Sequence, residues 1–161
     1  MLSVLDIFRI GIGPSSSHTV GPMRIAARFL RRLKHQGHLD ATHRIRIYYR
    51  GSLAFTGTGH GTPRAGQLGL LGFTPETIVA KEAEQALARL HETGSFIFDG
   101  HTLHFDSKKD SLLDFDTPAD LHPNEMHMTA WDAAGKRIYR RTYYSTGGGF
   151  IAAHAKLARP A

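Results

Sequence analysis

One proline limits where the longest regular segment of this chain can begin. Pro22 lies in the stretch Gly11–Arg24, which reads GIGPSSSHTVGPMR. Proline is tolerated in a helix only within the first turn, because the backbone N–H groups there have no partner inside the helix. With Pro22 as the third helical residue, Thr19 becomes the N-cap, a residue type suited to that position. We therefore predict a long helix from about Thr19 to His35, ended by Gly37.

The segment Ser15–His18 would then be a hydroxyl-rich loop ahead of this helix. A helix N-terminus carries partial positive charge and attracts carboxylate or phosphate groups. For a single serine, a simple N-cap would be the better interpretation. Three serines and one histidine between two glycine–proline corners are more than one cap needs, so we interpret the segment as an anion-binding loop.

The length of 161 residues indicates one domain, residues 1–161, large enough for a hydrophobic core. The chain has no cysteine, which excludes disulfides, zinc–thiolate sites and any cysteine-ligated cluster held by this chain alone. Apolar runs stay well short of the ~20 residues that a membrane span needs. The first ten residues have no basic n-region or cleavage site, so we expect a cytoplasmic protein with no membrane partner. His122 and His127 are not spaced as zincin ligands, and we expect no metal ligand in this chain.

The net charge of +6 and the sequence pI near 9.9 raise nucleic acid as a partner. However, many of the basic residues can share the outer face of the long helix, with apolar residues on its inner face. The basic set is Arg24, Arg28, Arg31, Arg32 and Lys34, and the apolar set is Val20, Met23, Ala27 and Leu30. A solvated helix face is the better explanation, and we expect no nucleic acid partner.

Predicted helices come early in the chain and predicted strands come late, which indicates an α+β fold rather than a doubly wound parallel sheet. The Ala-, Glu- and Leu-rich segment Lys81–Glu92 gives the clearest helix. A capping box at Ser3 and Asp6 predicts a short helix, and the Ala-rich end of the chain is also predicted to be helical. The other helix and strand predictions are a short helix from Thr62–Pro63 to Gly72 and strands at Arg44–Arg50, Ser95–Asp99, Thr102–Asp106, Ser111–Phe115, Met126–Trp131 and Arg137–Ser145.

Two further segments carry candidate functional residues. Glycines surround His60 in GTGHGT, where backbone N–H groups can approach a ligand closely. Taken alone, His60 is equally well explained as an acid/base group or as an ordinary loop residue. Asn124 follows Pro123 in HPNEM and would by default be a turn residue.

Together these segments resemble one family, the bacterial iron–sulfur-dependent L-serine dehydratases (L-serine ammonia-lyases). The matching segments are SVLDIFRIGIGPSSSHTVGPMRIA, GTGHGT, LGFTPETI, HPNEM and RTYYSTGGGFI. They span nearly the whole chain, in the order found in the family's β domain. The ending resembles the single-polypeptide form, in which a larger α domain follows.

This resemblance implies an enzyme that converts L-serine to pyruvate and ammonia at a [4Fe–4S] cluster. Cysteines of the α domain ligate the cluster in the family, so this chain would be a fragment without a cofactor of its own, inactive alone. The resemblance also implies a homodimeric full-length enzyme whose partners are L-serine and the α catalytic domain. The β domain is similar to the allosteric substrate-binding domain of some phosphoglycerate dehydrogenases, which implies a mixed β-sheet packed against helices.

Three positions match the family's proposed catalytic residues: His18, His60 and Asn124. Which histidine is the base stays open, because spacing does not separate them. The resemblance, together with the loop chemistry, predicts that Ser15, Ser16, Ser17 and Thr19 bind the substrate. The alternative function is a non-catalytic regulatory module that binds a small molecule at the same loop.

Overall fold

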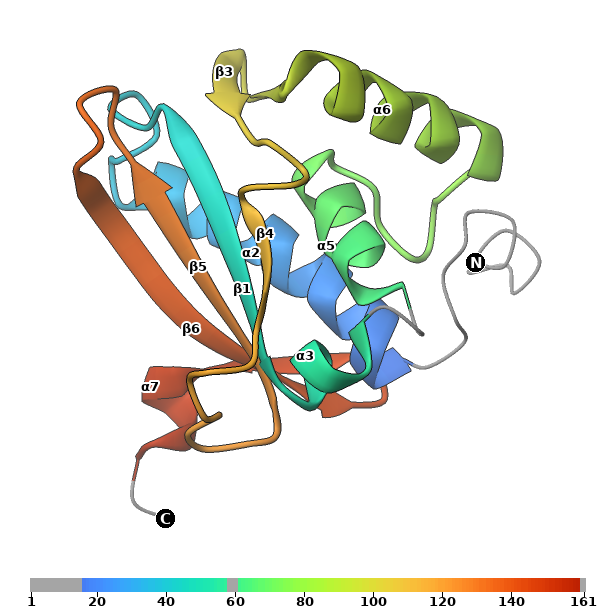
Figure 1. The fold of residues 1–161 in the computed structure, drawn as a ribbon, viewed down its shortest axis with the longest axis vertical. Helices are drawn as coiled ribbons and strands as arrows, with labels where there is room; N and C mark the ends of the chain where they lie inside the picture. The colour runs from blue at the N-terminus through green and yellow to red at the C-terminus, as the bar shows by residue number, and fades with distance from the viewer. Residues whose placement is uncertain (1–15, 58–60, 160–161) are drawn as a thin grey trace.

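The structure is a computed structural model that describes residues 16–57 and 61–159. Within these residues, seven strands form one mixed sheet with helices against one face, so the predicted α+β class is confirmed (Figure 1). The strand order is β2-β3-β1-β5-β6-β7, and β4 also pairs with β1. The strands are β1 (Arg44–Gly51), β2 (Ser95–Phe98), β3 (His101–His104), β4 (Ser111–Asp114), β5 (Asn124–Trp131), β6 (Arg137–Gly147) and β7 (Phe150–Ala153).

Strand β1 forms the centre of the sheet because its alternate side chains are apolar. Ile45, Ile47 and Tyr49 are fully buried, whereas the residues between them are partly exposed. β1 runs parallel to β3 and β4 and antiparallel to β5. The β1–β5 register pairs Gly51 with Asn124, so the end of β1 lies beside the start of β5.

Three helices make up the layer that covers the sheet. Helix α2 (Gly21–His35) packs on the sheet, α5 (Thr62–Leu70) packs against α2, and α6 (Ala80–Thr93) lies outside α5 (Figure 1). The inner face of α2 contributes Ile25, Phe29 and Leu33 to the main core. Of the residues predicted to face inward, Val20, Met23 and Leu30 are buried, whereas Ala27 is half-exposed, so the buried face is turned slightly from the predicted one. Short helices α3 (Ser52–Phe55) and α7 (His154–Leu157) follow β1 and β7.

The start of α2 differs from the prediction. Residues Ser16–Val20 form one π-helical turn, η1, that continues directly into the α-helix. Thr19 lies inside this turn, and Val20 occupies the N-cap position with helical dihedral angles and no side-chain cap. The predicted Thr19 N-cap and the loop over residues 16–18 are therefore wrong. The reason is that the wider π turn continues the helix through the serines; such turns occur frequently at functional sites.

The remaining predictions agree with the structure except near the C-terminus and in the residues that are not described. The hairpins β2–β3 and β5–β6 and helix α6 are confirmed. The Ala-rich end first forms strand β7, which pairs with β6, before the short α7. The predicted helix after Ser3 lies outside the described residues. In the described part of the chain, every helix is too short or too polar to cross a membrane.

Candidate active site at the start of helix α2

The π-helical turn holds His18 between two serine hydroxyls from different parts of the chain. The Ser17 Oγ lies 2.9 Å from His18 Nδ1, and the Ser52 Oγ lies 3.1 Å from Nε2. Both contacts are hydrogen bonds whose direction depends on the imidazole tautomer. His18 is half-buried. Its ring is therefore held at both nitrogens while still in reach of solvent.

Helix α5 supports the same turn from the other side. The Thr62 hydroxyl donates a hydrogen bond of 2.6 Å to the His18 carbonyl, and its side chain is fully buried. Thr62 is the first residue of α5, and Gly61 before it has φ of 73°. The helix predicted to begin at Thr62–Pro63 is therefore confirmed as α5, and the Thr62 hydroxyl holds the His18 backbone.

A close backbone approach places Ser52 beside His18. Gly51 has φ of 59°, and a Cβ there would lie 2.2 Å from the Pro123 carbonyl oxygen. The Ser52 N–H donates to the same carbonyl at 2.8 Å. Only glycine fits at position 51, because any side chain would meet this backbone. The end of β1 is thereby tied to the HPNEM segment.

Asn124 is the first residue of β5 rather than a loop residue. Its Nδ2 donates to the Ser145 carbonyl on β6 at 3.1 Å, and its backbone N–H donates to His122 Nδ1 at 3.0 Å. No described residue donates a hydrogen bond to Asn124 Oδ1, which leaves that oxygen available to accept one from a ligand. The side chain is half-buried.

A buried network holds the segment before Asn124 in place. The Glu125 carboxylate accepts hydrogen bonds from the Tyr144 hydroxyl at 2.7 Å and from the Asp120 N–H at 2.9 Å, and it pairs with Arg50 at 3.3 Å. Burial and the hydrogen bond to Glu125 raise the pKa of Tyr144, so its hydroxyl stays protonated and donates. Glu125 is 2% exposed. It therefore orients the chain around Asn124 rather than contacting a substrate.

The structure brings His18 and Asn124 to the same end of the molecule, linked through Ser52, Gly51 and Ser145. Ser16 and Ser17 are half-buried in the same turn, and Thr19 is buried at 1% exposure. Two predicted site residues, Ser15 and His60, lie outside the described residues. His60 precedes Gly61 and the Thr62 that bonds to His18.

Sequence reasoning missed three residues of this cluster: Ser52, Thr62 as a partner of His18, and Ser145. Thr62 and Ser145 lie within the recognised motifs GTGHGT and RTYYSTGGGFI, and Ser52 lies just after the predicted strand Arg44–Arg50. A single serine or threonine in such a place gives no signal of its own. Gly51 before Ser52 was the available signal, because a glycine ending a strand indicates a close backbone approach.

The residues present do not fit an iron–sulfur cluster. The chain has no cysteine. Moreover, over residues 16–57 and 61–159, no three His, Asp or Glu side chains are grouped so as to hold a metal ion. The hydroxyl, imidazole and amide groups of this cluster are suited to hydrogen bonding and proton transfer instead.

Comparisons with known proteins identify the family to which this chain belongs. The sequence profile of the serine dehydratase beta chain family matches residues 3–156. The chain is 44% identical over 151 residues to an L-serine dehydratase of Streptomyces coelicolor, covering 93% of this chain and 33% of that protein. It is 46% identical to an L-serine dehydratase of Mycobacterium bovis, with 93% and 32% covered, and 40% identical to the L-serine dehydratase TdcG of Escherichia coli, with 94% and 33% covered. The chain thus spans about a third of the length of these relatives. It belongs to the serine dehydratase beta chain family.

Proposed function

We propose that this chain forms the β part of an L-serine dehydratase and supplies substrate-binding and acid/base residues for converting L-serine to pyruvate and ammonia. The observation that carries the proposal is the convergence of His18 and Asn124 at the start of α2, in a chain of this family. Loss of water from serine requires removal of the α-proton and protonation of the leaving hydroxyl. Both steps need a group that exchanges protons near neutral pH.

His18 is suited to that exchange. Imidazole has an unperturbed pKa of about 6.5 and is a common general acid or base. The serine hydroxyls at its two nitrogens fix the ring plane, and the hydroxyl of a bound substrate would replace one of them. His60 is proposed as the second acid/base group, and the assignment of base and acid between the two histidines stays open.

Substrate orientation is assigned to the serines and to Asn124. Ser16 and Ser17 lie in the first turn of the helix, where a carboxylate is favoured by hydroxyl donors and by the helix dipole. Ser15, which precedes them in the sequence, is proposed to bind the same carboxylate. We propose that Thr19 belongs to the same binding set and acts from inside the turn, where it is buried. The free Oδ1 of Asn124 would accept a hydrogen bond from the substrate ammonium group.

A [4Fe–4S] cluster is proposed to lie in the rest of the enzyme. About two thirds of each relative's length lies outside the match, and this chain has no thiolate to bind iron. We therefore assign no step to a cluster held by these residues, and we expect the chain alone to be inactive toward L-serine.

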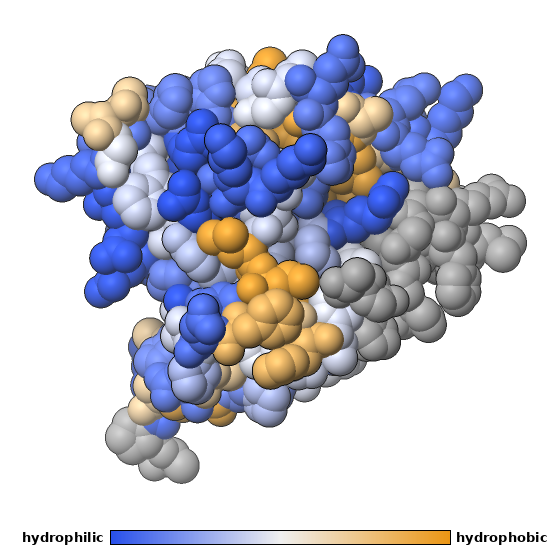
Figure 2. All heavy atoms as spheres, in the orientation of Figure 1, coloured by the Kyte–Doolittle hydropathy of each residue, from blue (hydrophilic) through white to orange (hydrophobic). Residues whose placement is uncertain are grey.

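An exposed aromatic pair next to the site supports a contact with that remaining part. Phe55 on α3 is 75% exposed and Phe115 after β4 is 55% exposed, and their rings meet edge to face at 5.3 Å. Ser52, the His18 partner, begins the same helix α3. Figure 2 shows a hydrophobic area on this part of the surface, where α3 and β4 lie in Figure 1. Exposed apolar patches of this kind mark protein interfaces.

The test uses the complete dehydratase that contains this chain, with His18→Asn and Asn124→Ala variants. For His18→Asn, loss of a general acid or base predicts a fall in kcat of about 10²–10⁴-fold. For Asn124→Ala, loss of an orienting hydrogen bond predicts a fall in kcat as well. Iron content and the cluster absorbance should stay at the wild-type level. His91→Asn, an exposed histidine at the end of α6, is the matched control. If His18→Asn keeps its turnover and changes only activation by a small molecule, the chain is a regulatory module instead.

A further inference from the structure

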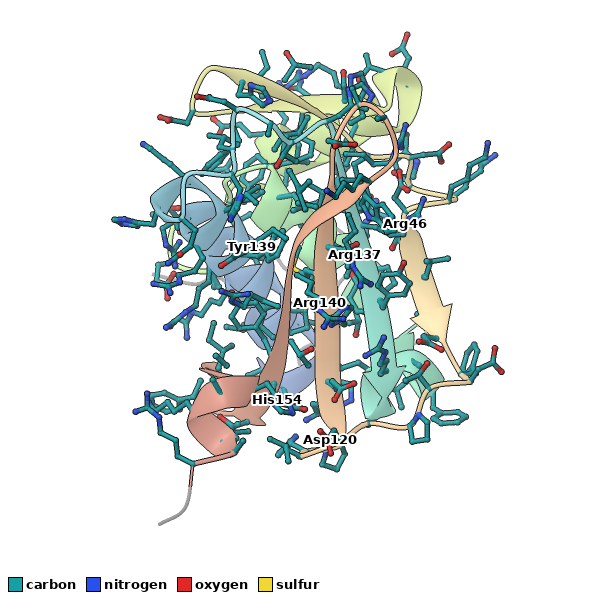
Figure 3. All side chains as sticks on the ribbon, turned by 90° about the vertical axis from the view of Figure 1, so that its left-hand side faces the viewer. Arg46, Asp120, Arg137, Tyr139, Arg140 and His154 are labelled. Carbon is teal, nitrogen blue, oxygen red and sulfur yellow. The ribbon has the colours of Figure 1, made fainter. Side chains whose placement is uncertain are left out.

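A cationic hollow of about 810 Å³ lies beside an unpaired stretch of strand β6. β7 has four residues and pairs only with the second half of β6, from Tyr143 to Gly147. Among the described strands, none pairs with residues 137–142 on that side. In Figure 3 this edge of β6 faces the viewer, with α2 on one side and α7, carrying His154, at its lower end. Residues 137 and 140–142 of this unpaired stretch line the hollow.

Six arginines from three elements line this hollow. They are Arg28 and Arg32 of α2, Arg50 of β1, and Arg137, Arg140 and Arg141 of β6. Arg50 pairs with Asp114 and Glu125. The other five form no ion pair with any carboxylate of residues 16–57 or 61–159. Arg24, Arg44 and Arg46, in contrast, each have a carboxylate partner.

Two groups that line the hollow are affected by these charges, each by a different set of three arginines. Burial raises the pKa of Tyr143 to about 12, while the positive charges of Arg28, Arg141 and Arg32 act in the opposite direction. Burial and then the charges of Arg50, Arg140 and Arg137 lower the pKa of His127 to about 4, against the opposing effect of Glu125. His127 is therefore neutral at pH 7, and its Nδ1 bonds to the Thr142 hydroxyl at 2.7 Å.

We propose that this hollow is a binding site for a small anion carrying two or more phosphate or carboxylate groups. Guanidinium groups bind both kinds of oxyanion through paired N–H donors. The volume is within the range of small-ligand pockets. The site shares no lining residue with the cluster around His18. Arg50 of the lining also pairs with Glu125 of the network beside Asn124, so the test substitutes other arginines of the hollow.

A small ligand fits this hollow better than a macromolecule does. An acidic peptide added to the edge of β6 would need apolar pockets for alternate side chains, but arginine, histidine and threonine dominate the lining. Nucleic acid binding uses a basic stripe that follows the phosphate backbone, often with stacking aromatic rings. Here the arginines of α2, β1 and β6 surround one hollow instead.

The test measures binding of inorganic pyrophosphate and of citrate, separately, to the complete protein by isothermal titration calorimetry. We expect saturable binding of at least one of them, with one ligand per chain and weaker affinity at higher salt. Arg32→Gln and Arg140→Gln should each weaken this binding about tenfold or more, because each removes a charge-assisted hydrogen bond. The two ligands show whether phosphate or carboxylate is preferred. As a second readout, the bound anion should raise the pKa of His127, followed by NMR of its imidazole protons.

The matched control is Arg31→Gln, an exposed arginine of α2 that does not line the hollow. This variant should bind like the wild type, within about twofold. An equal loss in Arg31→Gln would show general charge attraction and would overturn the site. The proposal is also wrong if neither anion binds saturably at millimolar concentration, in which case the arginines only protect the strand edge. Binding of an oligo-glutamate peptide or of DNA with neither small anion would overturn it as well.

Discussion

Gly21 and Ser145 approach so closely that a Cβ atom on Gly21 would lie 1.9 Å from the Ser145 hydroxyl oxygen. Gly21 is the first residue of α2 and Ser145 lies near the end of β6, so this contact joins the helix start to the sheet. The carbonyl of the same Ser145 accepts the hydrogen bond from Asn124. The distance between His18 and Asn124 therefore depends on how closely α2 packs against β6.

The contact predicts that Gly21→Ala destabilises the protein by about 1–3 kcal/mol, the usual cost of overpacking a tight contact. Ser145→Gly removes the atoms that the new methyl group would meet. The double variant should therefore lose less free energy of unfolding than the two single variants added together. Urea denaturation of the four proteins measures this coupling. Strictly additive losses would show that the side chain at position 21 does not meet Ser145, and no loss in Gly21→Ala alone would show that position 21 tolerates a side chain.

Replacing Asp110 should lower the free energy of unfolding more than replacing an exposed acidic residue does. Its carboxylate is 1% exposed, pairs with Arg44 and with Arg46 at 3.1 Å, and accepts the Asp106 N–H at 2.7 Å. Removing one partner of a buried pair costs about 3–5 kcal/mol. Because the arginines stay about one third exposed and can be hydrated, we expect Asp110→Ala to cost about 2–3 kcal/mol, by chemical denaturation.

The control for this prediction is an exposed ion pair in the same protein. Asp99 pairs with Lys34 at 3.0 Å, and both side chains are about half exposed. Asp99→Asn should change stability by less than about 0.5 kcal/mol, and asparagine tolerates the φ of 51° found there. If the Asp99 and Asp110 variants lose equal stability, burial does not decide the strength of these pairs.

The lowered pKa of His127 predicts that the free energy of unfolding falls at acid pH. Its pKa is about 4 in the folded protein, and the ordinary value of 6.5 applies to the unfolded chain. Between these two values the unfolded chain binds a proton that the folded protein does not, so stability falls as the pH drops from about 6.5 to about 4. His127→Asn should show a smaller loss of unfolding free energy between pH 7 and pH 4.5. The exposed His91→Asn variant should keep the wild-type loss, and an unchanged His127→Asn would contradict the assignment.

Replacing Ser52 should lower the rate of the reaction, because Ser52 positions His18 through a hydrogen bond and does not itself contact the reacting atoms. Ser52→Ala removes the hydroxyl 3.1 Å from His18 Nε2 and leaves the backbone bond to Pro123 intact. In the complete dehydratase we expect kcat to fall about tenfold and the pH–rate profile to shift, because the hydrogen bond tunes the basicity of the imidazole. Ser107→Ala, which removes a bond to Gln67 away from the site, is the control. A purely structural role would lower stability and leave the pH profile in place.

The sequence predicts the secondary structure of this domain well because its patterns are local. The alternation in β1, the Ala-rich α6 and the stop at Gly37 each depend on neighbouring residues, and each is confirmed. The π-helical turn was missed because its hydrogen bonding is decided by contacts with Thr62 and the sheet. Thr19 has the side chain of an N-cap, but tertiary contacts bury it inside the turn.

The candidate site could be predicted only as separate parts. Its histidine and asparagine were recognised from motifs, but their distance depends on the Gly51–Asn124 register and on the Gly21–Ser145 contact. Those are relations between segments more than 70 residues apart, and no single-segment pattern contains them. The arginine hollow was missed for the same reason, because α2 and β6 carry ordinary exposed arginines until they are packed side by side.

The two serine hydroxyls beside His18 have a consequence for proton movement. A hydroxyl both donates and accepts, so Ser17 and Ser52 fit either neutral tautomer of the ring. A proton taken up at one nitrogen can be matched by release from the other, and only hydroxyl hydrogens need to rotate. The imidazole can therefore pass a proton from one side of its ring to the other without moving a heavy atom, and it ends as the other neutral tautomer, which the same two hydroxyls also accommodate.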